Sequence, residues 1–204
     1  YQDLMDAGGF GRPHILNMLN VKYVLTGKKI NSPLFSQVIN HNGLYKNKAF
    51  LPRAWFVENI NNVTNQETSL QSVLSQSFDP KKEAVIVNYS GPEIPESSTG
   101  TAQIEILSEN QIVLTASTSG GGLLVLSEIY YKPGWKCEID GILTDIFQTN
   151  HVLRSIFVPE GTHSIKFYYD KNSWEITRLI SRISFLIILF SLIFLSWKEW
   201  RNKD

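Results

Sequence analysis

The chain has 204 residues, of which 43% are hydrophobic, and its 19 basic and 19 acidic side chains give a formal net charge of +0. This balance argues against a nucleic-acid partner, because a phosphate backbone is bound by a basic face. The single cysteine, Cys137, excludes an internal disulfide, and its place in an alternating strand favours a buried structural thiol over a nucleophile. The chain begins at Tyr1 without a methionine or a signal peptide, so we expect it to be part of a longer protein.

Residues 1–90 have the pattern of a mixed α/β region. Pro13 suits the first turn of a short helix over 14–19, and Asn20 can end that helix in a left-handed conformation. An Asn-Gly dipeptide at 42–43 is a hairpin signal, because these residues tolerate positive φ. Short apolar runs predict strands at 21–25, 54–57 and 84–87.

A helix is predicted between the second and third of these strands. Thr64 and Glu67 have the spacing of a capping box, and apolar side chains follow at helical spacing until the helix ends near Ser77. The succession of strand, helix and strand over 50–88 predicts a small α/β layer.

Residues 88–100 are rich in Pro, Ser and Gly and predict a linker or long surface loop. Residues 101–172 predict an antiparallel β-sandwich, because short strands alternate there with strong turn signals. The run 123–131 is too apolar for a half-solvated strand, so we expect it in the centre of a sheet. Further strands are predicted at 101–107, 111–117, 152–158 and 164–169.

The hairpin that begins at Trp135 has the clearest register. Trp135, Cys137 and Ile139 alternate with polar residues, so these three side chains are expected to point inward. We therefore expect the indole of Trp135 to be largely buried between the two sheets. Asp140-Gly141 predicts a type I′ turn, which a return strand over 142–147 would follow.

A long apolar segment follows the predicted sandwich at 179–197. As a helix it spans roughly 28 Å at ~1.5 Å per residue, close to the ~30 Å of a bilayer core. Arg182 is its only charged residue and lies near one end, where the side chain can reach lipid headgroups. Trp174, Trp197 and Trp200 flank the segment as interfacial aromatics do. We therefore predict a transmembrane helix rather than a buried core helix, although the basic residues at its two ends are balanced and give no orientation.

The predicted organisation is 1–90, mixed α/β region; 101–172, sandwich; 179–197, transmembrane helix; and 198–204, short charged tail.

Aromatic side chains cluster around a predicted turn between two strands. Tyr130, Tyr131 and Trp135 flank Lys132-Pro133-Gly134. Aromatic rings beside a turn can stack on sugars or enter a membrane interface. They can equally fill the end of the sandwich, and the sequence leaves both interpretations open.

No constellation of residues predicts catalysis, a metal site or a cofactor. Glu138, Asp140 and Asp145 lie close in sequence, but a solvated face with one turn residue accounts for them better than an acid–base pair or a cation site. The four histidines are scattered without metal-ligand spacing. No helix follows the glycines at 120–122 to hold a phosphate, and no nucleotide-binding or nucleophile motif occurs.

Several segments together resemble the C-terminal part of the YfhO-like bacterial membrane proteins. They are LNMLNVKYVLTG (16–27), LPRAWFV (51–57), LLVLSEIYYKPGWKCEIDG (123–141), Asn150, Arg154 and VPEGTHSIKFYY (158–169). The resemblance covers roughly residues 14 to 197. Each motif is weak alone, but their combination and order are specific. Lys132 is an insertion relative to the family's Tyr-x-Pro-Gly-Trp element and leaves the turn plausible.

The resemblance implies a polytopic bacterial membrane protein of the lipid-sugar glycosyltransferase (GT-C-like) type. Such proteins have many transmembrane helices, then an extracytoplasmic α/β and β-sandwich region, then a last helix. The expected location is the bacterial cytoplasmic membrane with the main domain extracytoplasmic, and the expected role is glycosylation of cell-envelope polymers from a polyprenyl-phosphate sugar. The acidic catalytic residues of such folds lie in an early loop that matches no position here, so this part is expected to be non-catalytic.

The expected partners are the lipid bilayer and, through the parent protein, a polyprenyl-phosphate sugar or an envelope polymer. With the resemblance, Arg154 joins Tyr130, Tyr131 and Trp135 as a candidate binding residue. A second hypothesis is a tail-anchored surface β-sandwich that binds carbohydrate or protein. Many hydrophobic spans in the upstream coding sequence would favour the first hypothesis, and a signal peptide directly upstream would favour the second.

Overall fold

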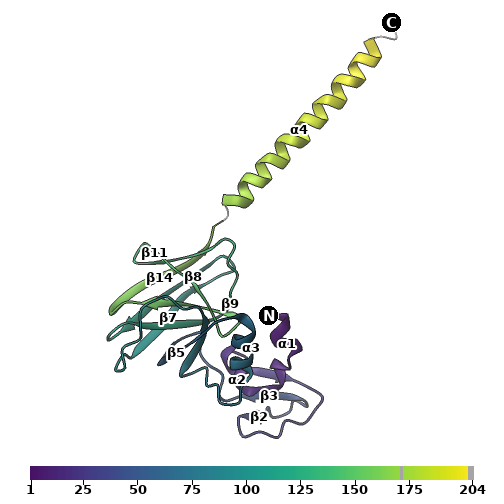
Figure 1. Cartoon of the computed structure of the whole chain (residues 1–204). Coiled ribbons are helices and arrows are strands. Elements are labelled where there is room, and N and C mark those ends of the chain that lie inside the picture. Colours follow the sequence, from purple (N-terminus) through teal and green to yellow (C-terminus); the bar gives the residue numbers. More distant parts are fainter. Residues whose placement is uncertain (171, 202–204) are drawn as a thin grey trace. The chain divides into compact units, whose positions relative to one another are not determined.

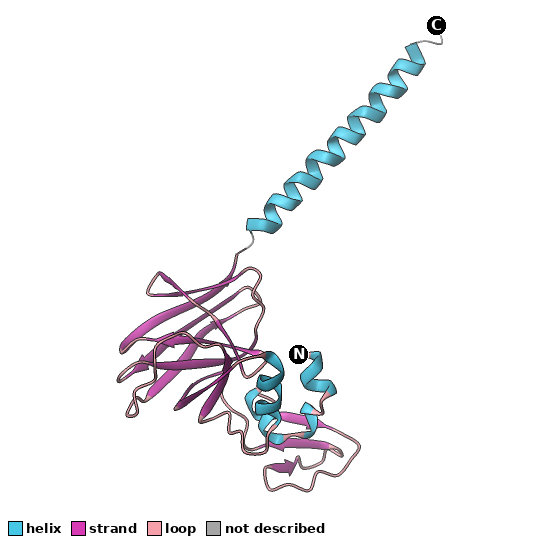
Figure 2. Cartoon of the chain, in the orientation of Figure 1, coloured by secondary structure: helices cyan, strands magenta, loops and turns pink. Residues whose placement is uncertain are grey.

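The computed structural model describes residues 1–170 and 172–201, and the chain forms two compact units, Tyr1–Tyr168 and Tyr169–Asp204 (Figure 1). The first unit is built mainly of strands, with short helices beside them, and the second contains one long helix (Figure 2). The predicted fold class, mainly β with a C-terminal helix long enough to cross a membrane, is confirmed.

The strands of the described chain form three sheets. The three-stranded sheet, in the order β1-β3-β2, contains β1 (Tyr23–Leu25), β2 (Phe35–Gln37) and β3 (Leu44–Asn47). The five-stranded sheet, in the order β11-β10-β14-β8-β7, contains β7 (Gly100–Leu107), β8 (Gln111–Thr118), β10 (Trp135–Ile139), β11 (Ile142–Thr144) and β14 (Gly161–Tyr169). The six-stranded sheet, in the order β4-β9-β13-β12-β6-β5, contains β4 (Ala54–Val57), β5 (Asn59–Val63), β6 (Glu83–Val87), β9 (Gly122–Ile129), β12 (Phe147–Thr149) and β13 (Leu153–Val158).

The six-stranded sheet is covered on both faces, and this explains why β9 is apolar throughout. Leu124 and Leu126 belong to the core between this sheet and the five-stranded sheet. Leu123 and Val125 point the other way, into a second core that also contains residues of the helices. Side chains alternate between the two faces of a strand, so a strand buried on both faces needs apolar residues at every position. The prediction that 123–131 forms a central strand is confirmed, because β9 lies between β4 and β13.

The helices of the first unit are short and lie in the first 74 residues. They are α1 (Gln2–Asp6), the 3-10 helix η1 (Gly9–Gly11), α2 (Pro13–Met18) and α3 (Gln66–Leu74). Pro13 occupies the first turn of α2 and Asn20 follows it at φ 56°, as predicted. Asp3 anchors α1, because its carboxylate lies 2.7 Å from Nε2 of the buried His151. That hydrogen bond lowers the pKa of the Asp3 carboxyl to about 2.

The predicted cap of α3 is wrong by one residue. The N-cap is Asn65 rather than Thr64, since the Asn65 side chain accepts a hydrogen bond of 2.8 Å from the backbone N–H of Thr68. The helix ends at Leu74, with Ser75 as its extended C-cap, instead of near Ser77. The α/β layer itself is present: β5, α3 and β6 follow one another and the two strands are parallel.

Residues 1–90 and 101–172 share one sheet and one core. Strands β4, β5 and β6 come from the first region, and β9, β12 and β13 from the second, yet all six belong to the six-stranded sheet. The segment 88–100 lies against this body instead of bridging two separate ones. The ring of Tyr89 lies 4.9 Å from that of Phe147, and the hydroxyl of Ser98 is 3.1 Å from that of Thr118.

The predicted hairpin after Trp135 is confirmed in register and turn but not in its return strand. Cys137 and Ile139 are buried, and Asp140 and Gly141 have φ of 51° and 82°, as a type I′ turn requires. The return strand β11 ends at Thr144, and after two residues the chain enters the opposite sheet as β12. The predicted strand 142–147 is therefore divided between the two sheets. Trp135 is half-buried rather than largely buried, because it lies at the end of the sandwich.

The second unit contains α4 (Asn172–Arg201). Its 21-residue stretch Glu175–Leu195 is long and apolar enough to cross a bilayer, and its side chains are exposed, which indicates that the chain associates with a membrane. Trp197 lies near the end of this helix. The side chains of Trp174 and Trp200 and the end of the predicted tail, 202–204, lie outside the described residues.

Candidate functional site

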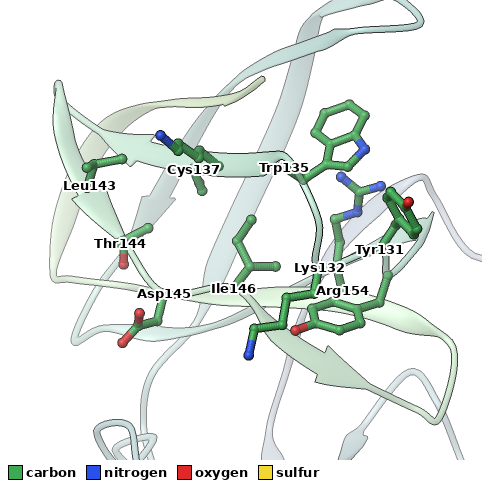
Figure 3. Close-up of a pocket in the computed structure, with 11 residues that line it drawn as sticks. Tyr131, Lys132, Trp135, Cys137, Leu143, Thr144, Asp145, Ile146 and Arg154 are labelled. Atoms are coloured by element: carbon green, nitrogen blue, oxygen red, sulfur yellow. The ribbon is translucent and has the colours of Figure 1, made fainter. Parts of the chain in front are cut away.

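A pocket of about 390 Å³ lies where β9 leads into β10, at the end of the sandwich (Figure 3). Its volume is within the ~300–1,000 Å³ typical of small-molecule sites. All four candidate binding residues line it: Tyr130, Tyr131, Trp135 and Arg154. The structure therefore brings together the aromatic cluster and the arginine that lies 19 residues beyond Trp135 in the sequence.

Trp135 reaches the pocket because a glycine turn aims the start of β10. Gly134 has φ 85°, a conformation that a residue with a side chain rarely adopts. β10 then alternates, so Trp135 shares the inward face with Cys137 and Ile139. As the first residue of the strand, Trp135 marks the boundary between the sandwich core and the pocket.

Arg154 occupies an interior position of the opposite sheet. Along β13 it lies on the same face as Ile156 and Val158, which both belong to the core between the sheets. The pairing of β13 with β9 shifts at this point: Leu153 lies opposite Ile129, whereas Arg154 lies opposite Leu126. Such an irregularity re-aims side chains. Arg154 thus projects into the end of the sandwich although only 4% of its surface is exposed.

The guanidinium of Arg154 lies against the indole of Trp135, with 4.3 Å between the guanidinium carbon and the ring centroid (Figure 3). This is within the distance of a cation–π interaction. Nη2 of Arg154 donates a hydrogen bond of 2.8 Å to the carbonyl of Ile129, while Nε and Nη1 are buried without a hydrogen-bond partner. Burial lowers the pKa of the Arg154 guanidinium.

The two tyrosines play different parts. Tyr130 continues the pairing of β9, since its backbone N–H donates a hydrogen bond of 2.7 Å to the carbonyl of Val152. Burial raises the pKa of its phenol. Tyr131 is 56% exposed and forms an outer wall of the pocket. Trp135 packs on the core with one part of its side chain and lines the pocket with another, so the packing interpretation holds for part of the ring and the ligand interpretation stays a prediction.

Sequence reasoning missed the rest of the pocket lining, which is Lys132, Lys136, Cys137, Leu143, Thr144, Asp145 and Ile146. Most of these residues come from the hairpin and from the crossing between the sheets. The available signal was the loss of period-2 alternation at Asp145-Ile146, where β11 has ended and β12 has not begun.

The three carboxylates considered from the sequence serve separate purposes. Glu138 accepts a hydrogen bond of 2.8 Å from the hydroxyl of Tyr168. The carboxylate of Asp140 accepts a hydrogen bond of 2.9 Å from the backbone N–H of Ser164, and its Oδ2 lies 2.6 Å from Nδ1 of His163. Asp145 alone lines the pocket. Burial raises the pKa of the Cys137 thiol, consistent with the structural role expected of it.

Within residues 1–170 and 172–201 no group of three or more His, Cys, Asp or Glu side chains has the geometry to hold a metal ion. The pocket offers stacking surfaces and a buried cation. These groups suit the binding of a polar molecule with an apolar face, which a sugar ring has.

Comparisons with protein-family models, with curated proteins and with solved structures find no match.

Proposed function

We propose that this chain is the non-catalytic, membrane-anchored C-terminal part of a YfhO-like envelope protein, and that its sandwich holds a saccharide. The pocket is the observation that carries this proposal. It joins three aromatic side chains with an interior arginine, and its lining comes from both sheets.

The residue motifs of the YfhO-like proteins support the assignment to a larger envelope protein. The longest of them, 123–141, contains three of the four candidate binding residues and runs through the pocket lining. We place the sandwich outside the cytoplasmic membrane of a bacterium, where envelope polymers are glycosylated. In this role the sandwich braces the catalytic membrane region and holds the polymer acceptor, while the lipid-linked sugar is bound elsewhere in the parent.

Saccharide titration of the full-length chain in lipid nanodiscs tests this proposal. We expect a neutral or acidic oligosaccharide to bind and Trp135→Ala to weaken the binding at least tenfold. Tyr23→Ala removes an aromatic ring that is 51% exposed and lies outside the pocket, so it should bind like the wild type. Unchanged binding by Trp135→Ala, or no saccharide binding at all, would contradict the proposal.

A second function is favoured by one other observation. Ile142 and Leu143 are 74% and 63% exposed on β11, an edge strand of its sheet. Exposed apolar edges pair readily with other chains. A tail-anchored surface domain would use such an edge to bind a protein.

The coding sequence upstream of residue 1 separates the two proposals. About ten hydrophobic spans there support the polytopic envelope protein, and a signal peptide directly upstream supports the surface domain. In both cases the purified chain should not transfer sugar from a polyprenyl-phosphate donor. Turnover of that donor by the chain would refute the non-catalytic role.

A further inference from the structure

We infer that the saccharide bound in this pocket carries an oxyanion, a carboxylate or a phosphate, and that Arg154 binds it. The inference rests on the proposed function, because it takes the pocket to be a saccharide site. Beyond the proposed function, it specifies that the ligand is negatively charged and that Arg154 is the residue that binds the charged group.

Arg154 is a buried cation whose hydrogen bonds are incomplete. Its side chain is 4% exposed, and among the described residues its hydrogen bonding is limited to the carbonyl of Ile129. Glu128 attracts the guanidinium at longer range, but the carboxylate of Glu128 is itself bonded to Arg53. An ionised group taken out of water is costly unless it is paired, so an anion at this position would stabilise the site.

The donors that remain on Arg154 have the geometry of an oxyanion site. A guanidinium has five N–H groups, and Ile129 accepts from one of the two on Nη2. The other Nη2 donor is parallel either to the donor on Nε or to one on Nη1, and both of those nitrogens lack partners. One edge of the guanidinium therefore keeps two parallel N–H groups, which match the two oxygens of a carboxylate or phosphate.

The pocket around Arg154 carries an excess of positive charge. Lys132, Lys136 and Arg154 line it, against one carboxylate, Asp145. The chain as a whole is neutral, so this excess is local. A cleft lined mainly by one sign of charge raises the local concentration of ligands of the opposite sign.

Trp135 covers the unpartnered donors. Its indole lies against the guanidinium (Figure 3), and Nε and Nη1 are buried. Trp135 is only half-buried and lies at the start of its strand, next to Gly134. A turn of the indole away from Arg154 uncovers the guanidinium edge and leaves the ring beside the bound sugar.

Three ligands test the inference on the full-length chain in nanodiscs: digalacturonate, glucose 1-phosphate and the neutral disaccharide galactobiose. We expect at least one acidic ligand to bind tenfold or more tighter than galactobiose. Preference for digalacturonate identifies a carboxylate, and preference for glucose 1-phosphate identifies a phosphate. In Arg154→Gln the ratio of acidic to neutral affinity should fall to about one. In Arg154→Lys the ratio should be intermediate, because lysine keeps the positive charge but lacks the two parallel N–H groups.

Lys81→Gln is the matched control, since it removes one positive charge from an exposed site outside the pocket and should keep the wild-type ratio. The Nε–H NMR signal of Arg154 in the wild type gives a second measurement that does not depend on a variant folding. It should shift on addition of the acidic ligand and not of galactobiose. Equal binding of all three ligands would overturn the inference and leave the proposed function intact, whereas no binding of any of them would overturn both.

Discussion

Asn150 joins three strands through one buried residue. It lies in the turn between β12 and β13 at φ 50°, and none of its surface is exposed. Its side-chain Oδ1 accepts a hydrogen bond of 2.8 Å from the N–H of Val85. Its own backbone N–H donates a hydrogen bond of 2.7 Å to the carbonyl of Val85. Asn150 therefore continues the pairing of β12 with β6 beyond Thr149.

We expect Asn150→Ala to destabilise the first unit by about 2–4 kcal/mol. The N–H of Val85 would lose its partner in the interior, which costs ~1–3 kcal/mol, and alanine would add about 1 kcal/mol for the left-handed backbone. Asn150→Gly accepts that backbone but also lacks the carbonyl, so its loss should be smaller by the backbone contribution. Thermal or urea unfolding measures both, and equal losses would refute the account of the turn.

Trp135→Ala should cost about 2–3 kcal/mol of unfolding free energy. This is less than the ~3–5 kcal/mol of a fully buried tryptophan, because the indole is half-buried and part of its contribution is the cation–π contact with Arg154. Tyr131→Ala, which removes a side chain that is 56% exposed, should change stability by at most about 0.5 kcal/mol. An unchanged melting point for Trp135→Ala would contradict the inward register of β10.

His163 and Asp140 form a pair that depends on pH. Nδ1 of His163 is 2.6 Å from the carboxylate of Asp140, and Nε2 is 3.0 Å from the carbonyl of Glu160. Both partners are acceptors, so only the imidazolium satisfies both contacts. The pair raises the pKa of His163 above 6.5 and lowers that of Asp140 below 3.8.

The pair should stabilise the fold most between about pH 4 and 6.5. The contribution of His163 is complete below 6.5 and is lost as the pH rises through its raised pKa, while that of Asp140 is complete above 3.8 and is lost as the pH falls through its lowered pKa. The difference in melting temperature between wild type and His163→Gln should therefore be largest near pH 5 and shrink toward pH 8. His41→Gln, at an exposed histidine, is the control variant. A difference that is constant with pH would show that the pair is not charged.

At the scale of single residues, local pattern predicts what a strand alone determines. The inward positions of Cys137 and Ile139 follow from period 2, and the φ values of Asp140 and Gly141 follow from turn chemistry. The burial of Arg154 does not follow from such rules, because arginine in an alternating strand reads as a solvent-facing residue. Its position depends on a shift in pairing with β9, which is a property of two strands together.

Among the elements, the start of α3 gives a direct test of which residue caps it. Asn65→Ala removes the side-chain oxygen that accepts from Thr68 and should cost about 1 kcal/mol. Thr64→Ala should cost less than about 0.5 kcal/mol, because Thr64 precedes the cap and is exposed. Chemical denaturation of the two variants separates the alternatives, and a larger loss for Thr64→Ala would restore the capping-box assignment.

The elements that sequence reasoning missed are those whose identity depends on distant partners. β5 contains three asparagines and no apolar alternation, and it is a strand because it pairs in parallel with β6. The division of 142–147 has the same origin. Ile142–Thr144 pairs with β10, whereas Phe147–Thr149 pairs with β13 and β6. Local propensity says nothing about which sheet a short strand will join.

For the whole molecule, membrane attachment is the property to test first. The full chain expressed in bacteria should remain in the membrane fraction after extraction with alkaline carbonate, because Glu175–Leu195 is long and apolar enough to span a bilayer. A chain of residues 1–170 should be released. The matched control is Phe185→Lys with Leu189→Lys, which places two charges near the centre of the span at a cost of about 2.5–3.5 kcal/mol each. Release of the unaltered chain would refute the membrane anchor.

The order of strands in the six-stranded sheet has a consequence for synthesis on the ribosome. β4 and β5 form the two edges of this sheet, and both are made before the four strands that lie between them. β4 ends at Val57 and its partner β9 begins at Gly122, so 64 residues must be made in between, which takes roughly 3–13 s at ~5–20 residues per second. During that interval Trp55 and Val57 have no strand to pair with, and a nascent chain in this state is prone to aggregation. β14 ends only two residues before α4 begins, so the sandwich cannot close until the ribosome has reached the anchor helix.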